Sequence, residues 1–195
     1  LFLKFMNDSL NYYKEKEKVW HISGWNLAAD FSSKDDVYFW RVMDCWGWAT
    51  WANRWKFFTK DTDDLLNTFT REDIFKFNLD GCDNLWSQVE NNSKGVIDTW
   101  AIYWYATIFK KNGLCLNPIK SYVRNIGLDG SGENCGHGND NLILNIKDDI
   151  RYENDYIENE DILEKIKLSY SRNKKNIILR IINKVSRAVR RSFSP

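Results

Sequence analysis

The sequence has little of what marks several common protein classes. Its 195 residues include two prolines and two histidines, and its four cysteines form neither a C-x-x-C pair nor a Cys/His spacing typical of zinc. The formal net charge is +1, so no global field indicates a nucleic-acid partner. No apolar run is long enough to span a bilayer. We therefore expect a folded soluble domain that binds no nucleic acid, with free thiols in a reducing compartment.

Aromatic residues are the abundant class, with ten Trp, nine Tyr and eleven Phe. Trp is favoured where a flat apolar face meets a sugar ring or a protein partner. The plainer interpretation is an aromatic-rich core, and composition alone does not separate the two.

Hydrophobic periodicity predicts helices alternating with short strands. Helices are expected at residues 1–14, 62–76, 83–91 and 97–111, and strands at residues 19–23, 37–42, 114–117 and 121–126. The first helix places an apolar face on one side, made of Phe2, Phe5, Met6, Leu10 and Tyr13. Asn112-Gly113 is a typical cap for the last helix. Residues 127–140 include five glycines and are expected to form a loop.

The end of the chain differs from the rest. Residues 148–161 are acidic and predicted to be exposed, whereas Lys165 to Pro195 contains ten basic residues and no acidic one. At 100° per residue, the apolar side chains of this tail fall on one side and the basic ones on the other. Such a helix lies on an anionic membrane, the interpretation we favour, or packs its apolar stripe on its own domain or a partner. We expect a main domain at 1–147, and an acidic linker with a basic amphipathic helix at 148–195.

Three segments carry residues suited to chemistry, namely His21 to Asn26, Asp44 to Trp51, and Ile97 to Trp100. In the second, a glycine lies between Trp46 and Trp48, which lets the backbone approach a ligand with a flat face on either side. Trp48, Trp51 and Trp55 also recur at helical spacing, as they would on one face of a helix.

Asp98 is a lone carboxylate among apolar and aromatic neighbours in the sequence. A setting that excludes water suits a general base, which has to lie within hydrogen-bond reach of a hydroxyl. The competing interpretation is structural, because Asp just before a helix is a favoured N-cap. From composition and spacing alone, capping is the better supported of the two.

His137 lies in the glycine-rich loop among Gly, Asp and Asn residues. A loop histidine in such surroundings suits a metal or a phosphate. The loop has no Walker lysine and no clear helix after it, so it is not a P-loop.

Taken in order, these segments resemble the family-two glycosyltransferases that build bacterial surface polysaccharides. The resemblance covers roughly residues 1–137 and is carried by LFLKFMNDSLNYYKEKEKVWHISGWN, RVMDCWGWATWANRWKFF and GVIDTWAIYWYATIFKKNGLCLNPIKSYVRNIGLDGSG. The chain is more distantly similar to the N-acetylglucosaminyltransferase that begins complex N-glycans. There, a Ser-Ala-Trp-Asn segment parallels Ser23 to Asn26, a Gly-Trp segment parallels Gly47-Trp48, and a Trp-Asp-Asp-Trp segment parallels Ile97 to Trp100.

The resemblance implies roles for individual residues. Asp98 takes the place of the catalytic base, and this shifts the balance from capping to catalysis. The implied substrate-binding residues are Asn26, Asp44, Trp46, Gly47, Trp48 and Trp100. A divalent metal, Mn²⁺ or Mg²⁺, would neutralise the departing diphosphate, and His137 is the candidate ligand in this chain. The family often has Thr-His or Val-His directly after Asp-Gly-Ser-Gly, whereas an insertion displaces the histidine here.

The resemblance also implies a fold class and a reaction. We expect an α/β chain that forms the C-terminal half of a GT-A fold, a mixed sheet with flanking helices, with the nucleotide-binding half and its acidic metal motif upstream of residue 1. The implied reaction is inverting transfer from a nucleotide-sugar donor to a glycan or lipid-linked acceptor, on the cytoplasmic face of a membrane. The alternative is a non-catalytic carbohydrate-binding or scaffold protein that uses the same Trp surfaces.

Overall fold

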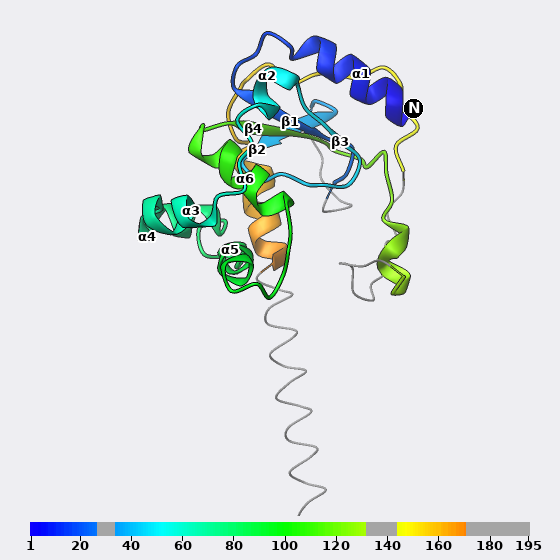
Figure 1. Ribbon diagram of the computed structural model, residues 1–195. Helices are drawn as coiled ribbons and strands as arrows, with labels where there is room; N and C mark the ends of the chain where they lie inside the picture. Colours follow the sequence, from blue (N-terminus) through cyan, green and yellow to red (C-terminus); the bar gives the residue numbers. More distant parts are fainter. Residues whose placement is uncertain (27–33, 132–143, 171–195) are drawn as a thin grey trace, which may run out of the picture.

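The computed structural model describes residues 1–26, 34–131 and 144–170. In this part of the chain, four strands form one mixed sheet in the order β2-β4-β1-β3 (Figure 1). The strands are β1 (Val19–Ser23), β2 (Val37–Trp40), β3 (Trp48–Ala49) and β4 (Leu114–Pro118). The two central strands, β1 and β4, run parallel, and each edge strand is antiparallel to its neighbour. The expected α/β class is confirmed as far as a mixed sheet with flanking helices.

Both faces of the sheet are covered, as the burial of every residue in β1, β2 and β4 shows. Alternate residues of β2 divide between two hydrophobic clusters. Val37 and Phe39 join one cluster, while Tyr38 and Trp40 join the other. A strand buried on both faces reads as a continuous apolar run, which explains why these segments were recognisable in the sequence.

Helix α1 (Phe2–Tyr12) covers one face of the sheet (Figure 1). It buries Phe5 and Met6, and Tyr13 directly after it is fully buried. The Phe5 ring stacks on Tyr122 with 4.5 Å between ring centroids. The helix and the apolar face predicted for residues 1–14 are therefore confirmed.

The other face is covered by a larger set of helices. They are α3 (Thr62–Thr68), α4 (Arg71–Phe77), α5 (Trp86–Ser93), α6 (Ala101–Lys110) and a helical stretch at 160–170. The short helix α2 (Ala52–Trp55) lies on the side of α1 in Figure 1. Helix α6 is the central one, because seven of its ten residues are buried. In the stretch at 160–170, Ile162, Leu163 and Ile166 belong to the same cluster. The acidic segment before it also packs on the sheet, since Tyr152 and Tyr156 contact the α1 side.

Local side-chain chemistry corrects several predicted elements. The helix expected at 62–76 is two helices, because Thr70 starts α4 with a capping box in which it exchanges hydrogen bonds with Asp73. The strand expected at 121–126 is absent among the described residues. Ser121 instead donates to the Val123 carbonyl, and Asn125 starts a 3-10 turn, η1 (Ile126–Asp129).

The aromatic segments also differ from expectation at their ends. Trp48 lies in strand β3 rather than on a helix with Trp51 and Trp55. Helix α6 begins at Ala101, four residues later than the predicted start. At its other end Asn112, with φ 49°, takes the left-handed conformation, so the predicted Asn-Gly cap is present with Asn as its left-handed residue.

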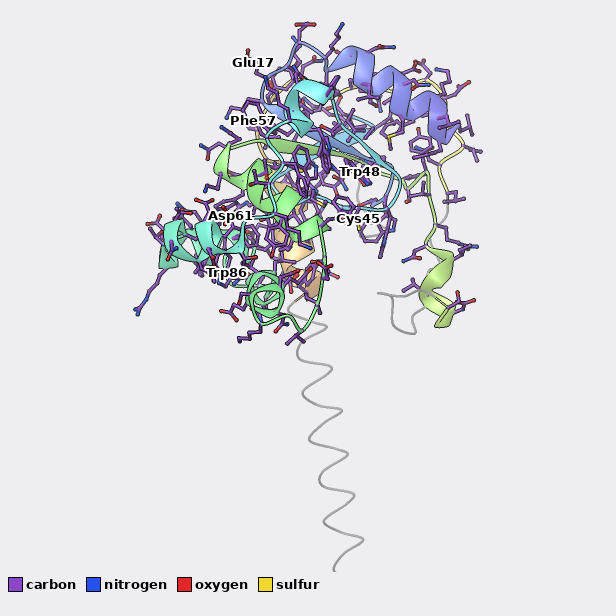
Figure 2. All side chains as sticks on the ribbon, in the orientation of Figure 1. Glu17, Cys45, Trp48, Phe57, Asp61 and Trp86 are labelled. Atoms are coloured by element: carbon purple, nitrogen blue, oxygen red, sulfur yellow. The ribbon has the colours of Figure 1, made fainter. Side chains whose placement is uncertain are left out.

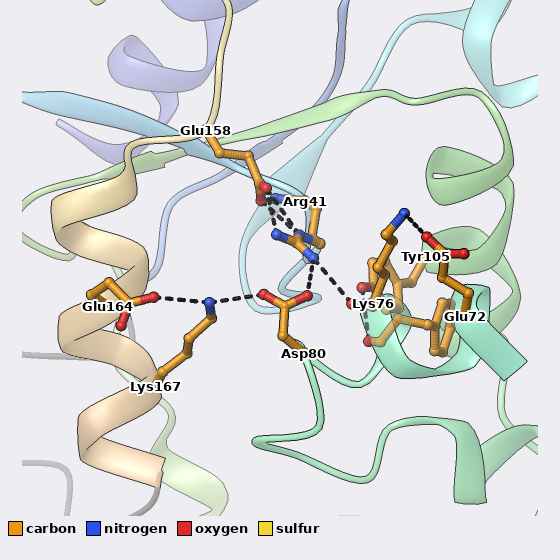
Figure 3. Close-up of polar contacts among 9 residues, drawn as sticks. Arg41, Glu72, Lys76, Asp80, Tyr105, Glu158, Glu164 and Lys167 are labelled. Atoms are coloured by element: carbon orange, nitrogen blue, oxygen red, sulfur yellow. Dashed lines mark hydrogen bonds and ion pairs between the residues drawn. The ribbon is translucent and has the colours of Figure 1, made fainter.

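A network of charged side chains joins the chain after residue 157 to the rest of the molecule (Figure 3). Arg41 binds both carboxylate oxygens of Glu158, with Nε–Oε1 and Nη2–Oε2 distances of 2.9 and 2.7 Å. Arg41 also pairs with Asp80, which in turn pairs with Lys167 of the helical stretch at 160–170. The neighbouring cations hold the pKa of the Asp80 carboxyl below its usual value. Two-point contact of Arg with a carboxylate fixes geometry as well as charge.

Removing the charge of Glu158 tests this network. The side chains of Arg41 and Glu158 are only 18% and 24% exposed, so we expect Glu158→Gln to lower the free energy of unfolding by roughly 1–3 kcal/mol. Glu164→Gln is the matched control, because Glu164 pairs with Lys167 but is 65% exposed, and its loss should be about 0–0.5 kcal/mol. Urea denaturation measures both, and equal losses would contradict the proposed role of the buried pair.

Candidate functional site

A cavity of about 300 Å³ lies between the end of β1, the segment after β2 and the start of α6. Trp25, Asp44 and Trp46 line it, and Ala101 and Ile102 close one side. The folded chain thus brings together residues from two of the three segments singled out in the sequence and the residues that directly follow the third. Figure 2 shows Cys45, also at this cavity, and Trp48 on the same stretch of chain.

Two tryptophans form one wall of the cavity. Trp25 follows β1, where its backbone N–H donates to the Ser23 hydroxyl at 3.1 Å and fixes the turn. The rings of Trp25 and Trp46 meet edge to face at 4.5 Å between centroids, an arrangement that aromatic quadrupoles favour. The Trp25 indole N–H is buried and has no hydrogen-bond partner in the part of the chain that the structure describes. Such an orphan donor is satisfied when a ligand brings an acceptor to it.

Asp44 supplies the carboxylate of the cavity. Its Oδ2 accepts a hydrogen bond of 2.7 Å from the Asn117 side-chain amide, a residue of β4. Burial raises the pKa of the Asp44 carboxyl to about 7, and the Asn117 hydrogen bond only partly opposes this. Desolvation disfavours the charged carboxylate, so Asp44 changes protonation near neutral pH, as acid–base groups of enzyme sites often do.

The His21 ring contacts the backbone of Asp44. Its Nε2 lies 3.0 Å from the Asp44 carbonyl oxygen, and its Nδ1 accepts from the Trp104 indole N–H at 3.2 Å. This pair of partners requires a neutral ring with the proton on Nε2. Burial lowers the pKa of His21 to about 4, so the ring stays neutral. The sequence marked the His21 segment but gave no signal of this supporting role, or of Asn117.

A second aromatic group lies beside the cavity. Trp48 stacks on Trp100 with 5.2 Å between centroids, and Trp55 packs on both rings. Trp100 remains 39% exposed. We call Trp48, Trp55 and Trp100 the tryptophan platform. Its exposed ring is the kind of flat apolar surface that binds sugar rings.

Asp98 lies two residues before Trp100, in an irregular turn that precedes α6. Asn92 of α5 fixes this turn, because its side-chain oxygen and nitrogen contact the Thr99 N–H and hydroxyl, each at 3.0 Å. The Asp98 side chain is 89% exposed and pairs with Lys60. The expected water-excluding setting is therefore wrong. The capping alternative is also wrong, because Trp100 occupies the N-cap position of α6 and no side chain caps it.

Two of the predicted binding residues have clear structural roles. Asn26 is 1% exposed, donates to the Ile119 carbonyl at 2.5 Å and accepts from the Tyr38 hydroxyl at 3.1 Å. Gly47 has φ 59°, and its carbonyl accepts from the Gly24 N–H at 2.7 Å. The close approach that Gly47 allows is thus to its own chain.

The metal and membrane hypotheses concern other parts of the chain. Residues 1–26, 34–131 and 144–170 contain no group of three or more His, Cys, Asp or Glu side chains suited to a metal. His137 and residues 171–195 of the predicted amphipathic helix lie outside the described residues. No helix within the described part is long and apolar enough to cross a bilayer. Cys82 and Cys115 are free thiols.

Comparisons with known proteins give no match, whether with family models, curated proteins or solved structures.

Substitution of Gly47 separates backbone strain from packing. A Cβ at residue 47 would lie 2.7 Å from Val123 Cγ1 and 3.0 Å from Phe2, whereas at Gly95, with φ 67°, it would meet nothing within 4 Å. Gly95→Ala should lower the free energy of unfolding by about 1–2 kcal/mol, the cost of the left-handed backbone alone. Gly47→Ala adds overpacking and should cost roughly 1–3 kcal/mol more. Urea denaturation of both variants measures the difference, and equal costs would contradict the packing role.

Asp44→Asn should stabilise the protein in a pH-dependent way. The pKa of Asp44 is raised from 3.8 to about 7, so the unfolded chain releases this proton at lower pH than the folded one. Stability of the parent protein therefore falls between about pH 4 and 7 and then levels off. The advantage of Asp44→Asn should grow by roughly 2–3 kcal/mol between pH 5 and pH 8.

Denaturant midpoints at both pH values give this advantage, and Asp149→Asn, which removes an exposed carboxylate, controls for the loss of one negative charge. An advantage of Asp44→Asn that is the same at pH 5 and pH 8 would show that the Asp44 carboxyl does not titrate in this range.

Proposed function

We propose that this chain is the acceptor-binding half of an inverting glycosyltransferase of GT-A type, acting with a nucleotide-sugar donor and a glycan or lipid-linked acceptor. The observation that carries the proposal is convergence. The segments Asp44 to Trp51 and Ile97 to Trp100 are 46 to 56 residues apart in the sequence. In the fold, Trp46 lines the cavity, and Trp48 stacks on Trp100, two residues from Asp98. The mixed sheet with helices on both faces agrees with this fold class.

In this proposal Asp98 is the general base. The acceptor hydroxyl oxygen forms a bond to the anomeric carbon of the donor as the bond from that carbon to the diphosphate oxygen breaks. The hydroxyl proton passes to Asp98, and the electron pair of the broken bond leaves with the diphosphate. The exposure of Asp98 lets a hydroxyl reach it, while Lys60 and the Asn92–Thr99 contacts hold its segment. General-base help of this kind contributes typically about 10²–10⁴-fold.

The tryptophan platform positions the sugar in the same proposal. Trp100 is half-exposed and lies two residues after Asp98, and the proposal is that a sugar ring placed on it presents its hydroxyl to this base. The cavity of Asp44 and Trp46 takes a neighbouring part of the acceptor. Holding the two reactants in this way replaces a bimolecular encounter with an oriented one.

A divalent metal, Mn²⁺ or Mg²⁺, belongs to this class of reaction, where it neutralises the leaving diphosphate. The described residues contain no cluster of three suitable side chains. In the proposal, as the resemblance implies, the ion is held mainly by the nucleotide-binding half, with His137 as the candidate ligand of this chain, and no step above depends on the metal. Peripheral attachment to the cytoplasmic face of a membrane through residues 165–195 is part of the proposal as well.

Asp98→Asn is the deciding experiment. In the protein that carries both halves, this substitution should reduce sugar transfer by about 10²-fold or more, because the base is lost. Donor binding should be unchanged, since Asp98 contacts the acceptor. Turnover with saturating donor measures the first quantity, and calorimetric titration with the nucleotide-sugar measures the second.

Asp63→Asn serves as the control, because Asp63 is an exposed carboxylate of α3. Near-normal turnover of Asp98→Asn, with normal donor binding, would refute Asp98 as base. Binding of a glycan without any transfer by the parent protein would favour the alternative, a carbohydrate-binding protein that uses the tryptophan platform.

A further inference from the structure

The walls of the Asp44 cavity have an unusual composition. Two Trp and two Tyr side chains, from Trp25, Trp46, Tyr105 and Tyr170, surround a single carboxylate. The face of an aromatic ring is negative and attracts cations, and rings grouped around one site are how proteins recognise organic ammonium groups. The cavity therefore offers a cation both a counter-charge and polarisable walls.

Among the described residues Asp44 has no cationic partner, whereas several other partly buried carboxylates do. Glu158 pairs with Arg41, Asp80 pairs with Arg41 and Lys167, and Asp36 pairs with Lys147. Within residues 1–26, 34–131 and 144–170, the side chain that hydrogen-bonds the Asp44 carboxylate is the neutral amide of Asn117. An enclosed carboxylate without a cation is costly, and a ligand that brings the cation recovers that cost.

Cys45 also lines the cavity, and five further titratable groups near Asp44 in the described part of the chain are uncharged near neutral pH. They are His21, Tyr38, Tyr105, Cys115 and Tyr170. Burial lowers the pKa of His21 to about 4, and burial raises the pKa of the three tyrosines and of Cys115. None of these five side chains therefore neutralises the negative charge that forms on Asp44.

A neutral sugar ring suits the cavity less well. A ring with several hydroxyls needs several polar partners, because each buried hydroxyl without one is costly. Besides Asp44, the lining offers mainly Gln88, the Trp25 indole N–H and two phenols, and the Tyr105 hydroxyl already donates to the Phe77 carbonyl at 3.0 Å. A volume of about 300 Å³ lies at the lower end of the range for ligand pockets, enough for a small cationic group.

We propose that the Asp44 cavity binds an organic ammonium group, with the Asp44 carboxylate as its counter-ion and the surrounding Trp and Tyr rings as its walls. The inference rests on the proposed function in one respect: it takes the cavity as part of the acceptor site, so that the ammonium group is a substituent of the acceptor. The binding itself requires no sugar transfer and no donor.

Binding of a permanent cation is coupled to the protonation of Asp44. The cation favours the ionised carboxylate, so below about pH 7 binding has to displace a proton. Affinity should rise with pH and level off above about pH 7. Between pH 5.5 and pH 8 we expect an increase of roughly tenfold or more. A neutral ligand in the same cavity has no reason to follow this profile.

Choline is a suitable probe, because its charge does not change with pH, and 3,3-dimethylbutan-1-ol is its neutral analogue of the same shape. Titrations followed by the indole N–H signals in NMR spectra give both dissociation constants. We expect choline to bind with the pH profile above and the neutral analogue to bind at least tenfold more weakly at pH 8. Asp44→Asn, which keeps the size of the side chain, should abolish the preference for the cation.

Asp149→Asn is the matched control and should bind choline as the parent protein does, because Asp149 is an exposed carboxylate outside the cavity. Equal binding of choline and its neutral analogue, or no binding of choline at pH 8, would overturn the inference. So would a choline affinity that is flat from pH 5.5 to pH 8 in the parent protein, a result that does not depend on any variant. Asp98→Asn should leave choline binding intact, so failure of the catalytic proposal and failure of this one are distinguishable.

Discussion

The side chain of Asn117 connects the sheet to everything that lies around the cavity. Its oxygen accepts from the Trp40 indole at 3.0 Å, and its amide donates to the Trp25 carbonyl at 2.9 Å and to Asp44 at 2.7 Å. One fully buried amide in the central strand β4 thus joins the end of β2, the turn after β1 and the carboxylate of the cavity. A residue that lacks either the donor or the acceptor would leave one of these groups unsatisfied in the interior, which is costly.

The sequence predicted the fold best where burial is continuous or strictly periodic. Strand β2 carries an uninterrupted apolar run, β1 and β4 carry mainly apolar runs, and helix α1 carries a one-sided apolar pattern, so these four elements were predicted. Predictions failed where a single polar side chain decides the backbone, as Thr70 does between α3 and α4 and Asn125 does at η1. Periodicity has no means of registering such local hydrogen bonds.

In the candidate site, too, the sequence predicted some features and not others. Trp46, Trp48 and Trp100 were found from composition, spacing and resemblance, and the fold brings them to neighbouring places. The environment of each carboxylate was not predictable, because it depends on contacts between distant segments. Asp98, expected to be shielded, is exposed, while Asp44 is enclosed by β4 and the aromatic walls. The two acids are therefore suited to different tasks, one open to an incoming hydroxyl and one held in a small apolar space.

Tyr170 gives the cavity a further property. It lines the cavity and also lies in the helical stretch at 160–170, whose Lys167 is joined to Asp80 and through it to Arg41. A ligand that packs on Tyr170 therefore adds to the stability of this helical stretch. By thermodynamic reciprocity, a partner whose binding the ligand strengthens through this stretch strengthens ligand binding by the same factor. Occupancy of the cavity and the packing of the stretch at 160–170 on the sheet are energetically linked.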